Sequence, residues 1–454
     1  MGQYNGGVAL DYRHGVTVKN LVVRDTYRGF DLTFADDNTI VGNTVINSAK
    51  AIYFWWSWRN NVTNNTITQA EYAIEFFLSP NYWSQDNIVT NNVVTDSEIG
   101  ISLMESNNTF ADNTISTSTI GISVSGYQNV FRNNTINIEG IGFRGTGFDS
   151  IVDETNLVNG KLIIYWVGQQ DKTVPSDAGQ VFLSNCKNVT AQNLNVTGIT
   201  LSSSTDCMIA GNTITGGRSG IQMICSSNNF VTGNVVVDNW FGLEVTSCEN
   251  NEIVGNNLSN NSYYGVLLTK SHYNTIKQNV VADNGFRKDF KSIPFEDYSS
   301  EIFGVKLLHS CNNLFVQNNV TGNNQYGIRV LGTQHDNIIY CNNFIDNKVT
   351  GLQVSMLGAS ANTIANHSIW DNGTVGNYWS DYLTRYPNAS EIDGTGVGDT
   401  PFYINPNNID NYPLMEPATI PEFPTWIILP IFVTATLSGL VVKKKLASYS
   451  KERS

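Results

Sequence analysis

Charged side chains are scarce in this chain of 454 residues. They make up 14% of it, and acidic groups outnumber basic ones, which gives a formal net charge of -13. A protein that binds nucleic acid needs clustered lysine and arginine to neutralise phosphates, and no such basic stripe runs along the sequence. The composition therefore argues against nucleic acid as a partner.

Side chains that bind soft metals are also sparse and scattered. The chain has 5 histidines and 6 cysteines, without a CxxC, HxH or HxxxH motif. Copper needs imidazole or sulfur ligands brought together, so copper is not an expected cofactor. Stacked coils would bring cysteines of neighbouring turns within disulfide reach, and Cys225 with Cys248 is the best candidate pair. Burial of the cysteines as small apolar side chains is the alternative.

Long apolar runs are absent except near the C-terminus. Trp426–Val442 carries no charge and is followed at once by three lysines. We predict a transmembrane helix at 426–442 and a basic cytoplasmic tail at 443–454, with a buried core helix as the alternative. No signal peptide is visible at the N-terminus. Because a surface protein needs an export signal, this suggests that the start is truncated or wrongly assigned.

Asparagine, in contrast, is abundant and recurs in a fixed phrase. Two asparagines stand five positions apart, usually with an apolar residue between them, and successive copies are mostly 21–24 residues apart. The clearest copies are 38–43, 60–65, 87–92, 108–113, 129–134, 188–193, 229–234, 251–256, 274–279, 313–318 and 337–342. We expect these side chains to stack as hydrogen-bonded ladders that hold turns, and we assign them no chemistry.

Between two phrases the chain contains three short stretches in which apolar residues alternate with other residues. In the copy at 212–234 the apolar positions include Ile214, Ile221, Met223 and Val231. This period of two predicts strands with one buried face, and three such strands can bury that face only by stacking on the next turn. We predict an all-β parallel β-helix of about a dozen three-strand coils of about 22 residues, which together form a rod about 60 Å long.

Places where the period is lost or lengthened give the expected boundaries. These are coils at 1–142, an irregular segment at 143–187, coils at 188–370 with a surface loop at 285–301, an end segment at 371–416, a linker at 417–425, and the membrane helix and tail. Inserted loops carry function more often than the coils do.

The N-x-I-x-x-N…GI…L…N pattern of residues 15–415 resembles the repeats of the NosD-like, carbohydrate-binding and sugar-hydrolase group. Asn159–Tyr165 and Ser176–Val181 strengthen the resemblance, and Asn377–Tyr382 with Asp410–Leu414 looks like the group's C-terminal end segment. The resemblance implies a right-handed parallel β-helix. It says less about activity, because the group includes unrelated functions.

The segment Pro421–Pro424, with the apolar run and lysines that follow, resembles the PEF-type sorting tails of archaeal surface proteins. This resemblance implies a cell-surface location and processing by a sortase-like enzyme, with a plain retained anchor as the alternative. Sequons of the N-x-S/T type fit a glycosylated surface protein, although a chain this rich in Asn, Ser and Thr also forms them by chance.

A first candidate sugar site lies beside an insertion near residue 80. Alternation places the residue after each glycine–apolar pair on the outer face, so Asp31, Tyr53 and Glu75 should form a column with aromatic neighbours. The candidate ligand-binding residues here are Tyr53, Trp55, Trp56, Glu75 and Trp83. If the protein is an enzyme, Asp31 and Glu75, about 10 Å apart, are the candidate catalytic carboxylates. Packing of the aromatic rings under the loop is the alternative.

A second candidate lies in the same outer column further along the chain. That column is expected to run through Gln222, Glu244, Leu267, Lys306, Arg329 and Gln353. Lys306 and Arg329 would be adjacent and form a local basic spot suited to an anionic sugar. A solvated surface balanced by nearby acidic residues is the alternative.

A possible calcium loop follows the coils. Glu391, Asp393, Thr395 and Asp399 alternate with glycines and place oxygen atoms as hard-cation loops do. The first position carries Glu where an EF-hand has Asp, and the last Glu of an EF-hand has no counterpart.

Together these features favour a protein anchored at the cell surface that binds carbohydrate or belongs to an adhesive or envelope layer. One alternative is a polysaccharide lyase, hydrolase or epimerase that acts on the outer sheet face near Tyr53–Glu75 or Lys306–Arg329. Another is a copper-handling accessory protein, as the NosD name implies.

Overall fold

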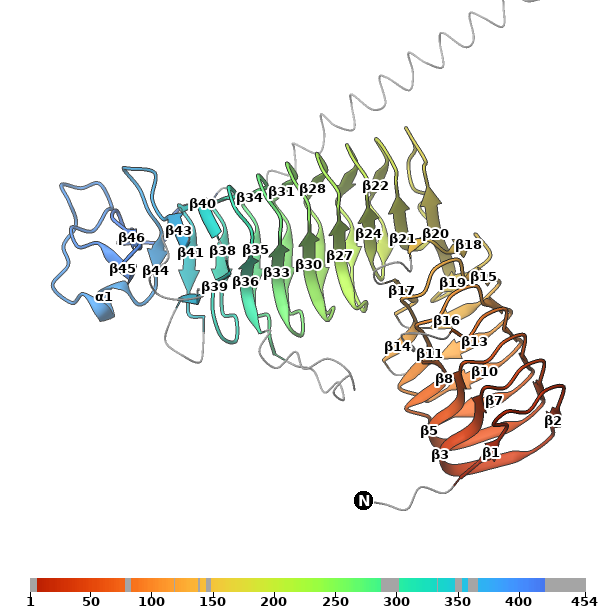
Figure 1. Cartoon of the computed structure of the whole chain (residues 1–454). Coiled ribbons are helices and arrows are strands. Elements are labelled where there is room, and N and C mark those ends of the chain that lie inside the picture. The colour runs from red at the N-terminus through yellow and green to blue at the C-terminus, as the bar shows by residue number, and fades with distance from the viewer. Residues whose placement is uncertain are drawn as a thin grey trace, which may run out of the picture.

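Figure 1 shows a computed structural model of the chain. The structure describes residues 6–77, 83–117, 119–137, 139–143, 148–286, 302–332, 334–347, 353–357 and 366–420. The predicted sorting motif, membrane segment and basic tail lie outside these ranges. Within the ranges, no helix is long and apolar enough to cross a membrane.

The chain forms a right-handed parallel β-solenoid of about 14 turns, which confirms the predicted fold class. One sheet of 21 strands runs through the whole molecule. It contains β1 (Val8–Ala9), β3 (Val22–Thr33), β5 (Thr44–Trp55), β7 (Thr66–Thr68), β8 (Tyr72–Phe76), β10 (Val93–Thr95), β11 (Ile99–Leu103), β13 (Thr114–Ser116), β14 (Ile120–Val124), β16 (Thr135–Asn137), β17 (Ile141–Phe143), β19 (Leu157–Val158), β20 (Lys161–Val167), β21 (Ala178–Ser184), β24 (Ile199–Ser202), β27 (Ser219–Ile224), β30 (Phe241–Thr246), β33 (Tyr264–Thr269), β36 (Phe303–Leu308), β39 (Ile328–Leu331) and β42 (Val354–Leu357).

Smaller sheets complete the walls of the solenoid. The second face of the first half is β2 (Thr17–Lys19), β4 (Thr39–Val41), β6 (Asn61–Thr63), β9 (Ile88–Thr90), β12 (Thr109–Ala111), β15 (Val130–Arg132) and β18 (Ile151–Val152). The second half has one sheet of β22 (Thr190–Gln192), β25 (Met208–Ala210), β28 (Phe230–Thr232), β31 (Glu252–Val254), β34 (Thr275–Lys277), β37 (Leu314–Val316), β40 (Gln334–Tyr340) and β43 (Asn366–Ile369). Its other sheet is β23 (Asn195–Val196), β26 (Thr213–Ile214), β29 (Val235–Val237), β32 (Asn257–Ser259), β35 (Val280–Ala282), β38 (Asn319–Thr321), β41 (Asn343–Ile345) and β44 (Tyr378–Trp379).

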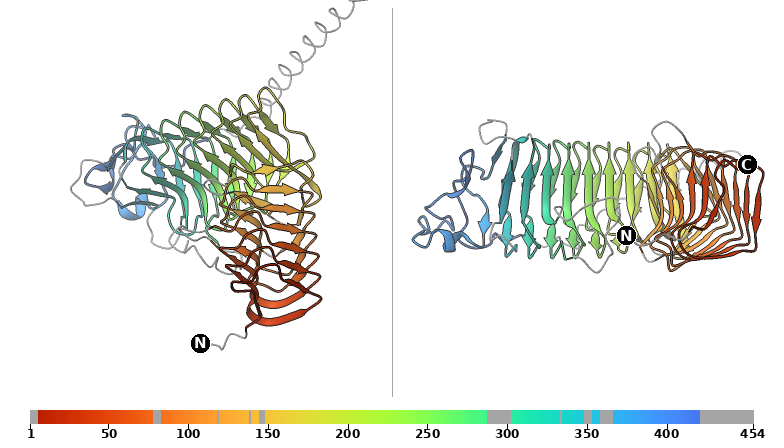
Figure 2. Two further views of the ribbon diagram at one scale, coloured as in Figure 1. Left: turned by 45° about the vertical axis from the view of Figure 1, so that its right-hand side comes forward. Right: turned by 60° about the horizontal axis from the view of Figure 1, so that its bottom comes forward.

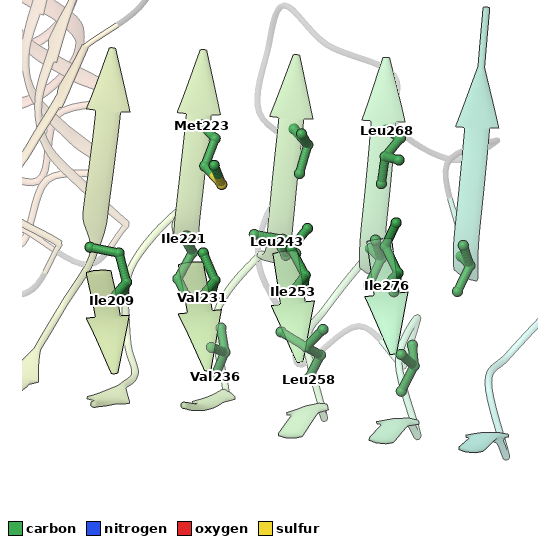
Figure 3. Packing of buried hydrophobic residues seen from close by; sticks show 14 of the residues in the cluster. Ile209, Ile221, Met223, Val231, Val236, Leu243, Ile253, Leu258, Leu268 and Ile276 are labelled. Atoms are coloured by element: carbon green, nitrogen blue, oxygen red, sulfur yellow. The ribbon is translucent and has the colours of Figure 1, made fainter. Parts of the chain in front are cut away.

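The inward side chains form columns along the solenoid axis. Ile209, Val231, Ile253 and Ile276 occupy matching positions on four successive strands, and Figure 3 shows them beside the column that contains Ile221. Such columns arise because every coil places its apolar residues at the same register. They bury the face that a single coil would leave exposed.

The predicted asparagine ladders are confirmed. In one of them the side-chain amide of Asn43 donates to Oδ1 of Asn65 at 3.0 Å, and the amide of Asn65 donates to Oδ1 of Asn92 at 3.0 Å. Each of these buried amides also donates to a backbone carbonyl of a preceding coil, as Asn65 does to Ile40 at 2.9 Å. The ladders therefore satisfy turn backbone groups that no strand partner reaches.

All six cysteines are free thiols. Cys248 is buried whereas Cys225 is exposed at a corner with a φ of 48°, so the candidate pair does not form a disulfide. Cys186, Cys207 and Cys311 are also buried, as expected for small apolar side chains.

The molecule bends where a straight rod was expected. Figures 1 and 2 show two arms, one of coils up to β18 and one from β20 onward, that meet at an angle. We call this junction the elbow. Here β20 and β21 are apolar on both faces: Tyr165 and Phe182 belong to the core of the first arm, whereas Ile164, Val181 and Leu183 belong to the core of the second. The bend lies in the segment 143–187, where the repeat is lost, because strands packed on both sides cannot keep an alternating pattern.

A cap of different chemistry ends the second arm. It consists of α1 (Tyr382–Arg385) and a hairpin of β45 (Phe402–Asn405) and β46 (Asn408–Asp410). Asp410 takes the place of the next ladder asparagine: its Oδ2 accepts from Asn377 N at 2.7 Å and Trp379 Nε1 at 2.9 Å, and its Oδ1 accepts from Tyr412 N at 3.1 Å. An acceptor-only side chain can end a ladder of donors.

This cap should respond to pH. Burial raises the pKa of Asp410 from 3.8 to about 7 and outweighs the N–H donors, which act in the opposite direction. Between these two values the folded state holds a proton that the unfolded chain has released, so the cap gains stability as the pH falls from 8 towards 5. We expect a carboxyl NMR titration of Asp410 with a midpoint near 7. A midpoint below 4 would mean that the hydrogen bonds dominate.

Candidate functional site

A pocket lies at the elbow, where strands of both arms contribute to its lining. Its volume is about 230 Å³. The walls come from β14 and β17 of the first arm and from β21, β24, β27, β30 and β33 of the second arm. The pocket therefore depends on the bend, because these strands are far apart in a straight solenoid.

Glu244 is the best-defined polar group in the pocket. Its Oε1 accepts a hydrogen bond from the Tyr264 hydroxyl at 2.7 Å, and its Oε2 accepts from the hydroxyl of Ser219 and, at 3.4 Å, from Nε2 of Gln222. These three donors fix the carboxylate in place. A carboxylate has about four lone-pair positions, so Glu244 can still accept from a ligand hydroxyl.

Two further charged groups line the same pocket. The guanidinium of Arg218 lies over the rings of Trp240 at 5.8 Å and Phe241 at 5.6 Å. Glu139 comes from the first arm, just before β17, and is buried. The described lining therefore contains two carboxylates and one guanidinium, together with the hydroxyls of Ser123 and Thr200.

Gln180 lines the pocket and joins the two arms. From β21 its Nε2 donates to the carbonyl of Ile141 at 2.9 Å, and its Oε1 accepts from the backbone N–H of the same residue at 3.0 Å. Ile141 lies on β17, so a side chain replaces the strand pairing that the bend interrupts.

An apolar cluster closes one side of the pocket. Six of its members precede glycine or alanine at the beginnings of strands in both arms, and the other two stand one position before such a strand. Its members are Tyr72, Ile99, Ile120, Trp240, Phe241, Tyr263, Tyr264 and Phe303. The rings of Phe241, Tyr264 and Phe303 are stacked on one another, with centroids 4.7 and 5.1 Å apart.

The predicted column of Asp31, Tyr53 and Glu75 has the expected register on three successive strands. Each of its three side chains interacts with a basic residue. Asp31 pairs with Arg28 at 2.6 Å, the Arg28 guanidinium lies 3.8 Å from the centre of the Tyr53 ring, and Glu75 pairs with Lys50 at 2.7 Å. Glu75 is fully buried, and that burial raises its pKa whereas Lys50 lowers it. These side chains thus point away from the core, as predicted, but they are partly or fully shielded from solvent.

The tryptophans of this candidate site are divided between the interior and the surface. Trp55 and Trp56 are half-buried, with ring centroids 5.2 Å apart, and Trp56 meets Phe34 edge-on at 4.4 Å. Trp83 is 51% exposed, and its carbonyl accepts from Nε1 of Trp58 at 2.5 Å. Tyr82, the residue before Trp83, lies outside the described residues. Sugar binding by this group stays a prediction.

Lys306 and Arg329 are in-register neighbours on β36 and β39, as their spacing predicts. Lys306 is buried, and Arg329 is half-buried with its guanidinium 5.8 Å from the Tyr326 ring centre. The next member of the column is Ser355 and not Gln353. Gln353 is displaced because its Oε1 accepts from Nδ2 of Asn347 at 2.8 Å, where it ends an asparagine ladder.

The residues of the possible calcium loop are all exposed. Glu391 accepts from Gly396 N at 2.6 Å, and the Thr395 hydroxyl donates to the Ile392 carbonyl at 2.6 Å. Asp399 accepts from Ser390 N at 3.0 Å, a bond that lowers its pKa. Asp393 lies at the turn with a φ of 44°. Calcium stays a prediction here, and among the described residues no three His, Cys, Asp or Glu side chains are grouped as metal ligands.

The sequence does not predict the elbow pocket. It places Gln222 and Glu244 in the outer column, and this placement is the only signal that points to the site. Glu139 and Arg218, however, stand just before strands where the repeat gives no guidance. Only the bend brings Glu139 of the first arm to the same pocket as Glu244 of the second.

Comparison with solved structures finds two epimerases and a pectate lyase at low similarity. The A-module of the Azotobacter vinelandii mannuronan C-5 epimerase AlgE6 is 12% identical, with a TM-score of 0.33 over 80% of this chain and 91% of that one. The periplasmic alginate epimerase AlgG is 13% identical, with a TM-score of 0.30 over 73% and 66% of the two chains. Pectate lyase Pel9A is 14% identical, with a TM-score of 0.27 over 63% and 72%. These values carry no argument about activity.

Family models match each arm separately. The model described as right handed beta helix region matches residues 2–136, in the first arm. The model described as periplasmic copper-binding protein (NosD) matches residues 164–384, in the second arm. No curated protein matches the sequence significantly. With the solenoid of parallel coils and its asparagine ladders, these matches identify the chain as a NosD-like right-handed parallel β-helix protein.

Proposed function

We propose that this protein binds carbohydrate outside the cytoplasm and that the elbow pocket is the binding site. The observation that carries the proposal is the convergence of polar groups from both arms in one pocket with apolar walls. Binding sites of small molecules combine mainly apolar walls with a few placed polar groups. Glu244, Gln222 and the nearby hydroxyls can serve a ligand whose surface alternates hydroxyl and C–H groups.

The proposed location rests on two features. The family model that matches the second arm is described as periplasmic. The apolar run at 426–442 and the PEF-type motif before it support attachment to the cell surface, with the solenoid outside. A sortase-like enzyme would act on that tail.

Copper does not enter the proposal, because the described donor groups do not fit it. The best imidazole pair is His335 and His367, in-register neighbours on β40 and β43, and Nδ1 of His335 lies 2.9 Å from Oδ2 of Asp336. Nowhere in the described ranges do three or more His, Cys, Asp or Glu side chains form a group that could hold a metal. Copper sites in proteins use imidazole and sulfur ligands gathered in one place.

Catalysis on a polysaccharide is a second candidate, favoured by one contact. The Tyr264 hydroxyl and the Glu244 carboxylate, 2.7 Å apart in the pocket, are a possible proton-transfer pair. A lyase or epimerase needs an acid and a base next to the sugar ring.

The test is retention of the full-length protein on a panel of neutral and uronic polysaccharides, with analysis of new chain ends. We expect retention, and we expect Glu244→Gln to weaken it about tenfold or more, since a hydrogen bond to a charged acceptor contributes about 1.5–3 kcal/mol. Glu252→Gln, the same change at an exposed position of β31, is the control. New chain ends that disappear in Glu244→Gln would favour the enzyme. Retention that is equal in both variants would contradict the site.

A further inference from the structure

We infer that the elbow pocket takes one sugar residue at the end of a glycan chain, and that it prefers an uncharged residue to a uronate. This inference rests on the proposed carbohydrate binding. It specifies which part of a glycan enters the pocket and what charge that part carries.

The pocket is small. The pocket volume of about 230 Å³ lies below the roughly 300–1,000 Å³ of pockets that hold drug-sized ligands. A space of this size suits a single ring with its hydroxyls. Several consecutive sugar residues would need a longer groove.

One side of the pocket is closed. Ile120 at the start of β14 and Phe241 at the start of β30 belong to the apolar cluster that joins the arms. The polar residues Ser123 and Glu244 lie three positions further along the same two strands. A glycan that enters along the strands thus meets the polar groups first and then a wall of apolar side chains, so a chain cannot pass through.

The described lining of the pocket carries more negative than positive charges. Among the described lining residues, Glu139 and Glu244 outnumber the single cation, Arg218. A sugar carboxylate placed beside Glu244 would meet a like charge in a partly enclosed space, where charges are poorly screened. Sugar hydroxyls, in contrast, can donate to the same carboxylate.

The experiment measures the affinity of the full-length protein for oligosaccharides of increasing length by calorimetry. The neutral probes are cello-, manno- and chitooligosaccharides from one to six residues, and the acidic probes are oligogalacturonates of the same lengths. In the series that binds, we expect the dissociation constant to change less than about threefold from the disaccharide to the hexasaccharide, and we expect uronates to bind at least about tenfold more weakly. An affinity that rises with every added residue, or a preference for uronates, would overturn the inference.

A pair of variants shows whether any observed binding uses the pocket. Thr200→Trp fills the pocket from β24, whereas Ser202→Trp places the same side chain on the same strand and face, two residues away and outside the lining. We expect only Thr200→Trp to abolish binding. Binding that survives both changes would refute the elbow site, and binding of neither series would refute the proposed function itself. Binding that depends on Thr200 but grows with chain length would refute chain-end recognition alone. The length series on the unaltered protein does not depend on the folding of either variant.

Discussion

Replacing Asn256 with alanine should lower the free energy of unfolding by about 3–6 kcal/mol, one of the largest effects expected for a single change outside the apolar core. The side-chain amide of Asn256 donates to the Val231 carbonyl at 2.9 Å and to Oδ1 of Asn279 at 3.0 Å. Its Oδ1 accepts from both the backbone N–H and the side-chain amide of Asn234, at 3.0 and 2.8 Å.

The size of this effect follows from burial. Asn256 and both ladder neighbours are at most 1% exposed, so the groups left behind by alanine have no water to bond. Each buried group without a partner costs about 1–3 kcal/mol, and the change leaves several of them in two neighbouring coils. The loss should therefore exceed that of a normal surface hydrogen bond by several-fold.

The measurement is urea unfolding of the full-length protein, followed by circular dichroism. Asn257→Ala is the matched control, because Asn257 is the next residue, is exposed, and its side-chain Oδ1 accepts a hydrogen bond from the nearby hydroxyl of Ser259. We expect the control to change the free energy of unfolding by less than about 0.5 kcal/mol. Equal effects of the two substitutions would show that the ladder adds no more stability than a surface asparagine does.

The ladders also explain how much of the fold could be predicted. Every coil of a solenoid has nearly the same structure, so Asn43, Asn65 and Asn92 occupy the same turn in successive coils. The number of residues between them is therefore the length of a coil. The register of the outer column, from Asp31 to Glu75, follows from the same spacing. Local periodicity is enough wherever each coil contacts only its neighbours.

The bend and the pocket could not be predicted in this way. Tyr165 and Phe182 alternate with residues of the second arm's core, and only the core of the first arm, to which they belong, shows why they are apolar. The contact between Gln180 and Ile141 likewise joins residues 39 positions apart, and no repeated spacing in the sequence predicts it. Contacts between the arms lie outside the nearest-neighbour pattern, so the site built from them does too.

The sequence does not predict the burial of the outer face, for a related reason. Alternation gives the direction of Glu75 but not what covers it, and the fully buried carboxylate pairs with Lys50 at 2.7 Å. A residue expected at a sugar-binding surface is thus part of a buried ion pair.

Lys50→Met should destabilise the protein by about 3–5 kcal/mol at pH 8, because it leaves the Glu75 charge buried without its partner. Methionine keeps an apolar side chain of similar length without the ammonium, which lies 4.9–5.7 Å from the ring centres of Tyr53, Tyr72 and Phe77. The double variant Lys50→Met with Glu75→Gln removes the charge as well, and we expect it to recover most of the lost stability.

The pH dependence of the Lys50→Met penalty separates lost charge pairing from lost packing. Burial already raises the pKa of Glu75 and Lys50 lowers it, so removal of Lys50 raises the folded-state pKa further above the unfolded value. A carboxyl with a raised folded pKa binds its proton more tightly in the folded state, and stability is therefore regained as the pH falls through that pKa. The difference between Lys50→Met and the unaltered protein in urea unfolding should shrink from pH 8 to pH 5. A difference that stays constant over this range would assign the loss to packing and would mean that Glu75 does not carry a buried charge.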